Sequence, residues 1–237
     1  SVPHDENAIV TLGEAVARLG GQKLPHHPPS SVAAFFEAAA QAQPDDRVAE
    51  LLRAVLVPDQ ADAALADLPV EERDRLMFDA MLRNTCAPTL LNAGLKRNVI
   101  PSEARVGLSG RPLPGATESS FIDEVRFLVG DSVDVDLTEP FRAGVQFDHD
   151  TPLFDALAAS TRQFEPNAVV VPYMQTGGTD ARFLRDLDIH VYGFIPMRPE
   201  PGPGFFELCH GHDERVSTAN ITFAVQVLFD AIVRLCT

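Results

Sequence analysis

The 237-residue chain carries 34 Asp and Glu residues against 19 Lys and Arg, which gives a formal net charge of −15. This acidic excess argues against binding to nucleic acid, which needs a basic face, and against an anionic membrane surface. Three scattered cysteines without a CxxC pair argue against a disulfide scaffold and suit a reducing cytoplasm.

No apolar run approaches the ~20 residues of a membrane span, and the first residues lack the basic and apolar regions of a signal peptide. The absence of an initial Met suggests a fragment or a processed product. The first predicted helix is Ala8 to Leu19, whose apolar residues recur on one helical face. Asp5 or Asn7 could cap this helix, and Gly20-Gly21 ends it. His26 and His27, in the Pro-rich loop that follows, are expected to be solvated.

From Ser30 to Arg83 the pattern predicts acidic, amphipathic packing helices without catalytic residues. These are Val32 to Gln43 with a Ser31 cap, Val48 to Leu56 after Asp46, a short helix or loop at Ala61 to Leu68, and Arg73 to Leu82 opened by Glu71.

Beyond Asn84 the pattern changes to short extended segments and predicts strand, strand, helix, strand. The segments are a strand at Thr85 to Leu91, a strand at Ala104 to Leu108, a helix at Ser119 to Val129 capped by Thr117, and a strand at Val133 to Leu137. A boundary is expected near Asp148-His149-Asp150. The remainder reads as β-α-β with a parallel crossover: a helix at Leu153 to Gln163, a strand at Ala168 to Pro172, a helix at Ala181 to Leu187, a strand at His190 to Ile195 and a final helix at Asn220 to Leu235.

Two polar loops in this last part are candidate binding elements. The stretch from His210 to Arg215 holds two imidazoles, two carboxylates and a guanidinium, so it could either bind metal or form a charged turn before the last helix. The turn from Gly177 to Arg182 could bind a substrate carboxylate through backbone N–H groups, or be a plain turn with an Asp cap. Both follow predicted strand ends, where ligands of open α/β sheets bind.

Two further residues, Arg111 and Asn98, are candidate ligand contacts by residue type. Arg111, just past a strand, could clamp a carboxylate or simply be solvated. Asn98 could donate an amide hydrogen bond to a ligand or form an Asx-turn.

Four segments occur together and in order: Ser1 to Ala8, Asn92 to Pro101, Gly177 to Arg182, and His210 to Val216. As a set they resemble the di-zinc family that includes aminoacylase, acetylornithine deacetylase and succinyl-diaminopimelate desuccinylase. The run from Asn84-Thr85 to Pro101, with the helical stretch before it, most resembles the carboxypeptidase S branch. The resemblance covers nearly the whole chain.

The resemblance implies an α/β fold: an incomplete ferredoxin-like lid (dimerisation) domain with a helical insertion, plus the C-terminal α/β segment of a zinc-hydrolase catalytic domain. Residues 1–140 would be the lid, with the insertion at about 30–83, and residues 150–237 the catalytic segment. The chain would begin inside the lid, after its first strand. Unpaired strand edges of this kind favour association, so a homodimer through the lid is expected.

Roles implied by the resemblance fall on matching positions only. His210 matches the C-terminal zinc ligand, and His212 does not. Substrate contacts are implied at the remaining positions: Asn98 near the scissile carbonyl, Arg111 at the substrate carboxylate, and Gly178, Thr179 and Arg182 in a substrate-contacting turn. The family's other metal ligands and its general-base Glu have no counterpart in this sequence.

A single His cannot hold a catalytic zinc, which needs about three protein ligands. The sequence therefore predicts part of a cytoplasmic hydrolase of N-acyl amino acids or small peptides with a free carboxylate. The intact family enzyme binds two zinc ions per site, and this chain alone is expected to retain none and to be inactive. The alternative is a truncated, non-catalytic relative that serves in dimerisation. A plain α/β binding module is a third possibility.

Overall fold

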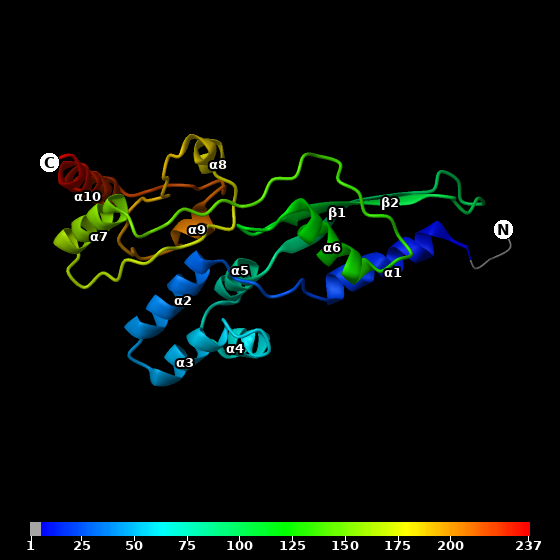
Figure 1. Cartoon of the computed structure of the whole chain (residues 1–237), viewed down its shortest axis with the longest axis horizontal. Helices are drawn as coiled ribbons and strands as arrows, with labels where there is room; N and C mark the ends of the chain where they lie inside the picture. The colour runs from blue at the N-terminus through cyan, green and yellow to red at the C-terminus, as the bar shows by residue number, and fades with distance from the viewer. Residues whose placement is uncertain (1–5) are drawn as a thin grey trace. The chain divides into compact units, whose positions relative to one another are not determined.

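The computed structural model describes residues 6–237, apart from the side chains of residues 205 and 206. The chain divides into two compact units. One comprises the chain as far as Gln146 together with Pro172–Arg182, and the other comprises Phe147–Val171 and Phe183–Thr237. The architecture is mixed, with many helices and one small antiparallel sheet (Figure 1).

The first unit contains a β-hairpin with two helices along one face (Figure 1). Strands β1 (Thr85–Ala93) and β2 (Ala104–Arg111) pair antiparallel from Thr85↔Arg111 to Ala93↔Ala104. Helices α1 (Ala8–Gly21) and α6 (Glu118–Val129) pack on the hairpin and on each other. The core between them is made of buried apolar side chains: Ala15, Leu19, Leu24, Phe121, Val125, Leu128 and Val129.

The caps of these two helices follow from local sequence. The side chain of Asn7 accepts a hydrogen bond from the Ile9 N–H at the start of α1, whereas Asp5, the other predicted cap, lies outside the described residues. Thr117 caps α6 as predicted, because its hydroxyl accepts from the Ser120 N–H in a capping box.

Four helices of the same unit form a bundle with its own core: α2 (Ser30–Ala42), α3 (Asp46–Ala54), α4 (Ala61–Asp67) and α5 (Glu72–Leu82). Val32, Phe36 and Val55 are fully buried at its centre. Arg75 satisfies the last carbonyls of α4, since its guanidinium donates to the Leu65 oxygen at 2.8 Å. The predicted helices are confirmed here with shifted bounds: α2 starts at Ser30, so the predicted cap Ser31 lies inside it, and α3 starts at Asp46, with Asp45 as its cap.

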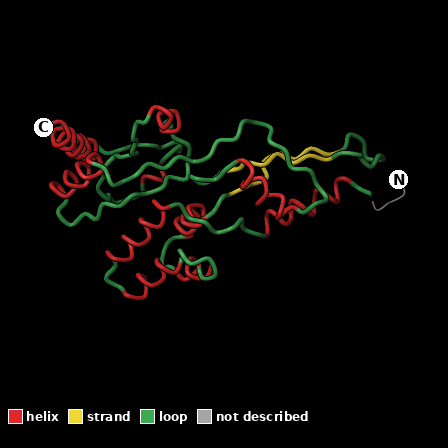
Figure 2. Tube along the Cα trace, viewed as in Figure 1, coloured by secondary structure: helices red, strands yellow, loops and turns green. Residues whose placement is uncertain are grey.

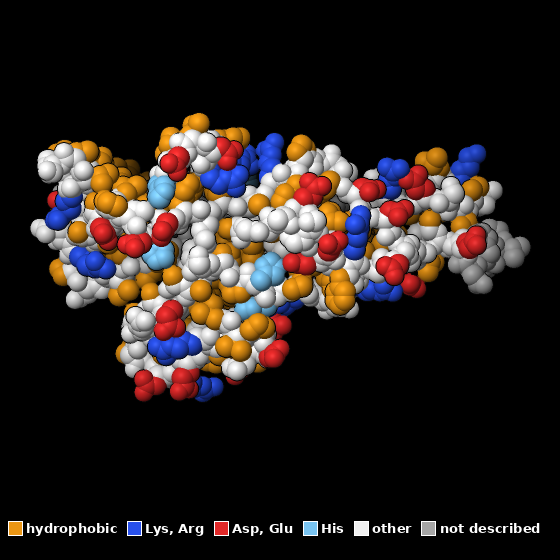
Figure 3. Space-filling model, in the orientation of Figure 1, with side chains coloured by type: hydrophobic (Ala, Val, Ile, Leu, Met, Phe, Trp, Pro, Cys, Tyr) orange, Lys and Arg blue, Asp and Glu red, His pale blue; other side chains and the backbone are white. Residues whose placement is uncertain are grey.

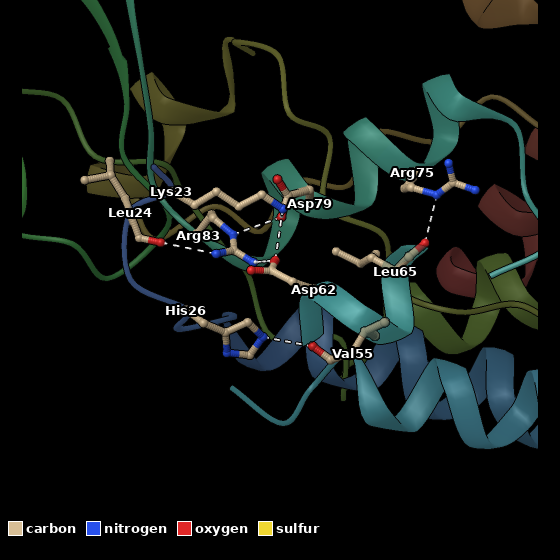
Figure 4. Close-up of polar contacts among 9 residues, drawn as sticks. All are labelled: Lys23, Leu24, His26, Val55, Asp62, Leu65, Arg75, Asp79 and Arg83. Atoms are coloured by element: carbon tan, nitrogen blue, oxygen red, sulfur yellow. Dashed lines mark hydrogen bonds and ion pairs between the residues drawn. The ribbon is translucent and has the colours of Figure 1, made fainter. Parts of the chain in front are cut away.

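The chain enters and leaves the bundle through one polar junction (Figure 4). Arg83, whose side chain is 7% exposed, forms ion pairs with Asp79 at 2.9 Å and Asp62 at 2.7 Å. Lys23, on the incoming segment, pairs with the same two carboxylates. His26 forms an antiparallel bridge with Arg83, so the two connecting segments lie side by side.

The second unit is built on two packed helices, α7 (Pro152–Phe164) and α10 (Thr218–Cys236). Phe223, Val227 and Ala231 of α10 are buried. Length and composition alone would allow α10 to cross a membrane, contrary to the expectation that no segment approaches a span. One face of α10 packs on α7, but only 28% of its apolar window is buried, and Val225, Phe229 and Ile232 on the rest of the helix are exposed.

Three predicted strands are wrong, because Val133 to Leu137, Ala168 to Pro172 and His190 to Ile195 are irregular segments (Figure 2). The only sheet formed by residues 6–237 is the β1–β2 hairpin, so the predicted parallel β-α-β arrangement is also absent from these residues. A strand exists only when a neighbour accepts and donates its backbone hydrogen bonds. A side chain holds part of this backbone instead: the Val135 carbonyl accepts a hydrogen bond from the Arg126 guanidinium at 3.1 Å.

Candidate functional site

Arg111 is the last residue of β2 and is exposed. Its neighbour Gly110 faces α6, because a Cβ at Gly110 would lie 2.7 Å from the ring of Phe121. Successive side chains of a strand alternate between faces, so Arg111 points to the face that α6 does not cover. Within residues 6–237 no carboxylate pairs with its guanidinium, which leaves the charge available to an anion.

Asn98 lies in the connection between the two strands, at residues 94–103, and is exposed. The turn is closed by the backbone, where the Val99 N–H donates to the Lys96 oxygen at 3.3 Å. This connection follows the Ala93↔Ala104 pair, whereas Arg111 pairs with Thr85 at the other end of the hairpin. At ~3.3 Å per residue, the two positions are separated by roughly 20 Å of strand, and the hairpin does not bring them together.

Gly178 and Thr179 lie in the predicted turn before helix α8 (Ala181–Leu184), and Arg182 is the second residue of that helix. The Thr179 hydroxyl accepts a hydrogen bond from the Ala181 N–H at 3.4 Å, so Thr179, and not Asp180, is the capping side chain. The Thr179 carbonyl accepts from the Arg182 N–H at 3.5 Å. Gly178 is exposed with open space around its Cα, so its backbone is accessible to a ligand.

His210 lies in a tight turn between α9 (Phe205–Leu208) and α10, and its side chain is exposed. Its φ of 63° is left-handed, a conformation uncommon for a non-glycine residue. The Gly211 N–H donates to the Leu208 oxygen at 2.9 Å, and a Glu214 carboxylate oxygen accepts from the His210 N–H at 3.3 Å. These hydrogen bonds involve the backbone of the loop and not the imidazole of His210, which is exposed.

The described residues do not fit a metal site by themselves. No three His, Cys, Asp or Glu side chains within them lie close enough together to hold an ion. On the face drawn in Figure 3, acidic side chains are dispersed among Lys and Arg and are not gathered into one patch. His210 and the substrate-contact residues also belong to different compact units, because Asn98, Arg111 and the 177–182 turn are all part of the first.

The prediction that both histidines are solvated holds for His27, which is exposed, but not for His26, which is partly buried. Nε2 of His26 lies 2.8 Å from the Val55 oxygen, and Nε2 of His27 lies 2.9 Å from a Glu124 oxygen. His26 therefore contacts the helical bundle at the end of α3, and His27 contacts α6, the helix packed on the hairpin. Pairing at this range depends on residues 29 and 97 positions away, which the local pattern of an adjacent His pair does not reveal.

The profile of peptidase family M20/M25/M40 matches residues 8–234, nearly the whole chain. The chain belongs to this family. The resemblance read from the four ordered segments is thereby confirmed, including its carboxypeptidase S-like character. Enzymes of the family are generally metal-dependent hydrolases.

Several proteins that are similar in sequence to this chain are named as carboxypeptidases or as N-fatty-acyl-amino acid synthase/hydrolases. The chain is 31% identical over 160 residues to the probable carboxypeptidase S-like 2 of Dictyostelium discoideum, covering 65% of this chain and 30% of the relative. It is 30% identical over 160 residues to the human N-fatty-acyl-amino acid synthase/hydrolase PM20D1, covering 66% and 32%. The corresponding zebrafish protein, PM20D1.1, is 26% identical over 245 residues, covering 99% and 45%.

The chain thus spans between about a third and under half of the length of these relatives. No solved structure gives a significant match.

Proposed function

We propose that this chain forms the lid and the C-terminal catalytic segment of a zinc-dependent hydrolase that cleaves N-acyl amino acids or small peptides with a free carboxylate. The observation that carries the proposal is the family match over residues 8–234. The names of the relatives, a carboxypeptidase and N-fatty-acyl-amino acid synthase/hydrolases, fit amide substrates that end in a carboxylate.

Arg111 is proposed to bind the substrate carboxylate. A guanidinium suits this role because it presents parallel N–H donors to two carboxylate oxygens. Its support is that the side chain is exposed, points away from α6 and has no carboxylate partner within residues 6–237. Asn98 would contact the scissile carbonyl region. Gly178 and Thr179, in the turn before α8, and Arg182, in its first turn, would contact the substrate as well.

His210 is proposed as one zinc ligand, with His212 as a neighbour that does not bind. A catalytic zinc needs about three protein ligands, and no group of three or more potential ligands lies within the described residues. The other ligands and the general base would therefore come from parts of the protein outside this chain. The 237-residue chain alone is therefore proposed to be inactive. Its cytoplasmic location stays a prediction.

The hairpin supports a proposed homodimer. The sheet formed by residues 6–237 has only two strands, so each strand leaves one edge without a backbone partner. Edges of this kind pair readily with another chain. If the complete protein lacked the remaining metal ligands, this association would be the function left, and the chain would be a non-catalytic dimerisation module. Light scattering that finds only a monomer would rule out the dimer.

Metal content tests the proposal. The complete gene product that carries this chain is expected to bind two zinc ions per protomer and to lose part of that content, with its hydrolytic activity, in His210→Ala. His212→Ala is the matched control, since it removes an imidazole from the same exposed loop and should keep both. Unchanged zinc stoichiometry in His210→Ala would refute the ligand assignment.

A further inference from the structure

The segment just before the 177–182 turn packs on the helical bundle. Pro172–Arg182 belongs to the same compact unit as helices α2 to α5, although about 90 residues separate it from α5. Met174 packs against the core of the bundle. Met174 is three residues from Gly177, so the turn can move at most ~10 Å from this anchor at ~3.3–3.6 Å per residue.

Tyr173 makes the specific contacts of this anchor. Its ring lies edge-on to Phe35 of α2, with centroids 5.5 Å apart and an interplanar angle of 75°. Phe35 in turn packs on Phe78 of α5 and on the fully buried Phe36. Edge-to-face pairs of this kind are stabilising beyond the area that they bury.

The phenol group extends the anchor to α5. The Tyr173 hydroxyl donates to the sulfur of Met77 at 2.9 Å. Partial burial, followed by the charge of Asp74, raises the pKa of Tyr173, whose hydroxyl is a neutral donor at physiological pH with or without this shift. Tyr173 thus contacts both α2 and α5 of the bundle.

We propose that the helical bundle α2–α5 positions the substrate-contacting turn, and that Tyr173 and Met174 are the positioning residues that connect the two. The turn holds two adjacent glycines, Gly177 and Gly178, whose backbone is the most permissive of any residue. Without an anchor, the ordering of these residues would have to occur when substrate binds, which raises KM. The kinetic part of this inference rests on the proposed function; the anchoring part does not.

Amide hydrogen exchange of the 237-residue chain tests the anchor directly. Tyr173→Ala is expected to raise exchange of residues 176–182 roughly 2- to 12-fold, the effect of losing one aromatic pair, while α2–α5 stay protected. Tyr173→Phe keeps the ring contact with Phe35 but loses the bond to Met77, so its exchange should lie between those of the parent and Tyr173→Ala. Phe127→Ala removes a ring that is 84% exposed on α6 and should change nothing in the turn. Unchanged exchange in Tyr173→Ala would overturn the inference.

Kinetics of the complete gene product test the consequence. Tyr173→Ala should raise KM with a smaller change in kcat, and Tyr173→Phe, which keeps the ring but not the bond to Met77, should have a KM between the two. Faster exchange with an unchanged KM would overturn the positioning role. If the parental protein hydrolyses no N-acyl amino acid, the proposed function fails on its own, and the exchange measurement still decides whether the bundle anchors the turn.

Discussion

Replacing Asn84 is expected to destabilise the junction between the bundle and the hairpin more than any exposed polar substitution nearby. Asn84 is 1% exposed. Its side-chain oxygen accepts from the Leu113 N–H at 2.7 Å, and its amide donates to Glu124 at 2.8 Å. Asn84→Ala removes both bonds at once.

The size of the effect follows from these two partners. The buried Leu113 N–H would lose its acceptor, which costs about 1–3 kcal/mol, and the bond to a charged carboxylate adds about 1 kcal/mol. The Glu124 carboxylate would lose the Asn84 amide but keep His27 as a partner at 2.9 Å, so it would lose only part of its hydrogen bonding. The free energy of unfolding should therefore fall by roughly 2–4 kcal/mol.

Urea unfolding followed by circular dichroism measures this change. Asn92→Ala is the matched control, since Asn92 is an exposed Asn of β1 that pairs with Arg105 only through backbone register. It should stay within about 0.5 kcal/mol of the parent. An Asn84→Ala variant that unfolds with the parental midpoint would show that the buried amide does not hold the junction.

Three further outcomes are expected. Arg83→Met should cost about 1–3 kcal/mol, because it removes a buried cation and leaves Asp62 and Asp79 with Lys23 alone, whereas Arg53→Met, at an exposed pair, should cost under about 1 kcal/mol. Partial burial raises the pKa of Asp62, but hydrogen bonds and charges of Lys23 and Arg83 outweigh it and lower the pKa below 3.8. The stability contributed by this carboxylate is thus present above pH 3.8 and lost as pH falls through the lowered pKa, which acid titration of unfolding in parent and Asp62→Asn checks. Gly110→Ala should destabilise by about 1–3 kcal/mol, since its Cβ would meet an aromatic ring at 2.7 Å, whereas Gly13→Ala, with open space, should be neutral or stabilising in thermal unfolding.

Helices were predictable because their signals are local. Apolar spacing placed the helix at Ala8 to Leu19, and α1 covers Ala8–Gly21. Thr117 was recognisable as a cap because its partner Ser120 is three residues away. The β1–β2 hairpin was predictable for the same reason, since a ten-residue connection joins two extended runs.

Strands without a sequence-adjacent partner were not predictable. His190 to Ile195 has the apolar composition of a strand, but a strand forms only where a neighbour completes its hydrogen bonds, and no neighbour does so within residues 6–237. The candidate site shows the same limit. His210, Arg111 and the 177–182 turn were selected by residue type and resemblance, whereas contacts such as Tyr173 with Phe35, 138 positions apart, have no signature in a single sequence.

The most direct test of the central claim is hydrolysis of an N-acyl amino acid and of its α-carboxamide by the complete gene product, with and without a chelator. If the protein is a zinc-dependent hydrolase of substrates with a free carboxylate, we expect hydrolysis of the carboxylate substrate that a chelator abolishes, and little hydrolysis of the carboxamide. Arg111→Met should erase that preference, and Arg105→Met, an exposed Arg of the same strand, should keep it. Equal hydrolysis of both substrates by the parent, or none of either in the presence of zinc, would contradict the account.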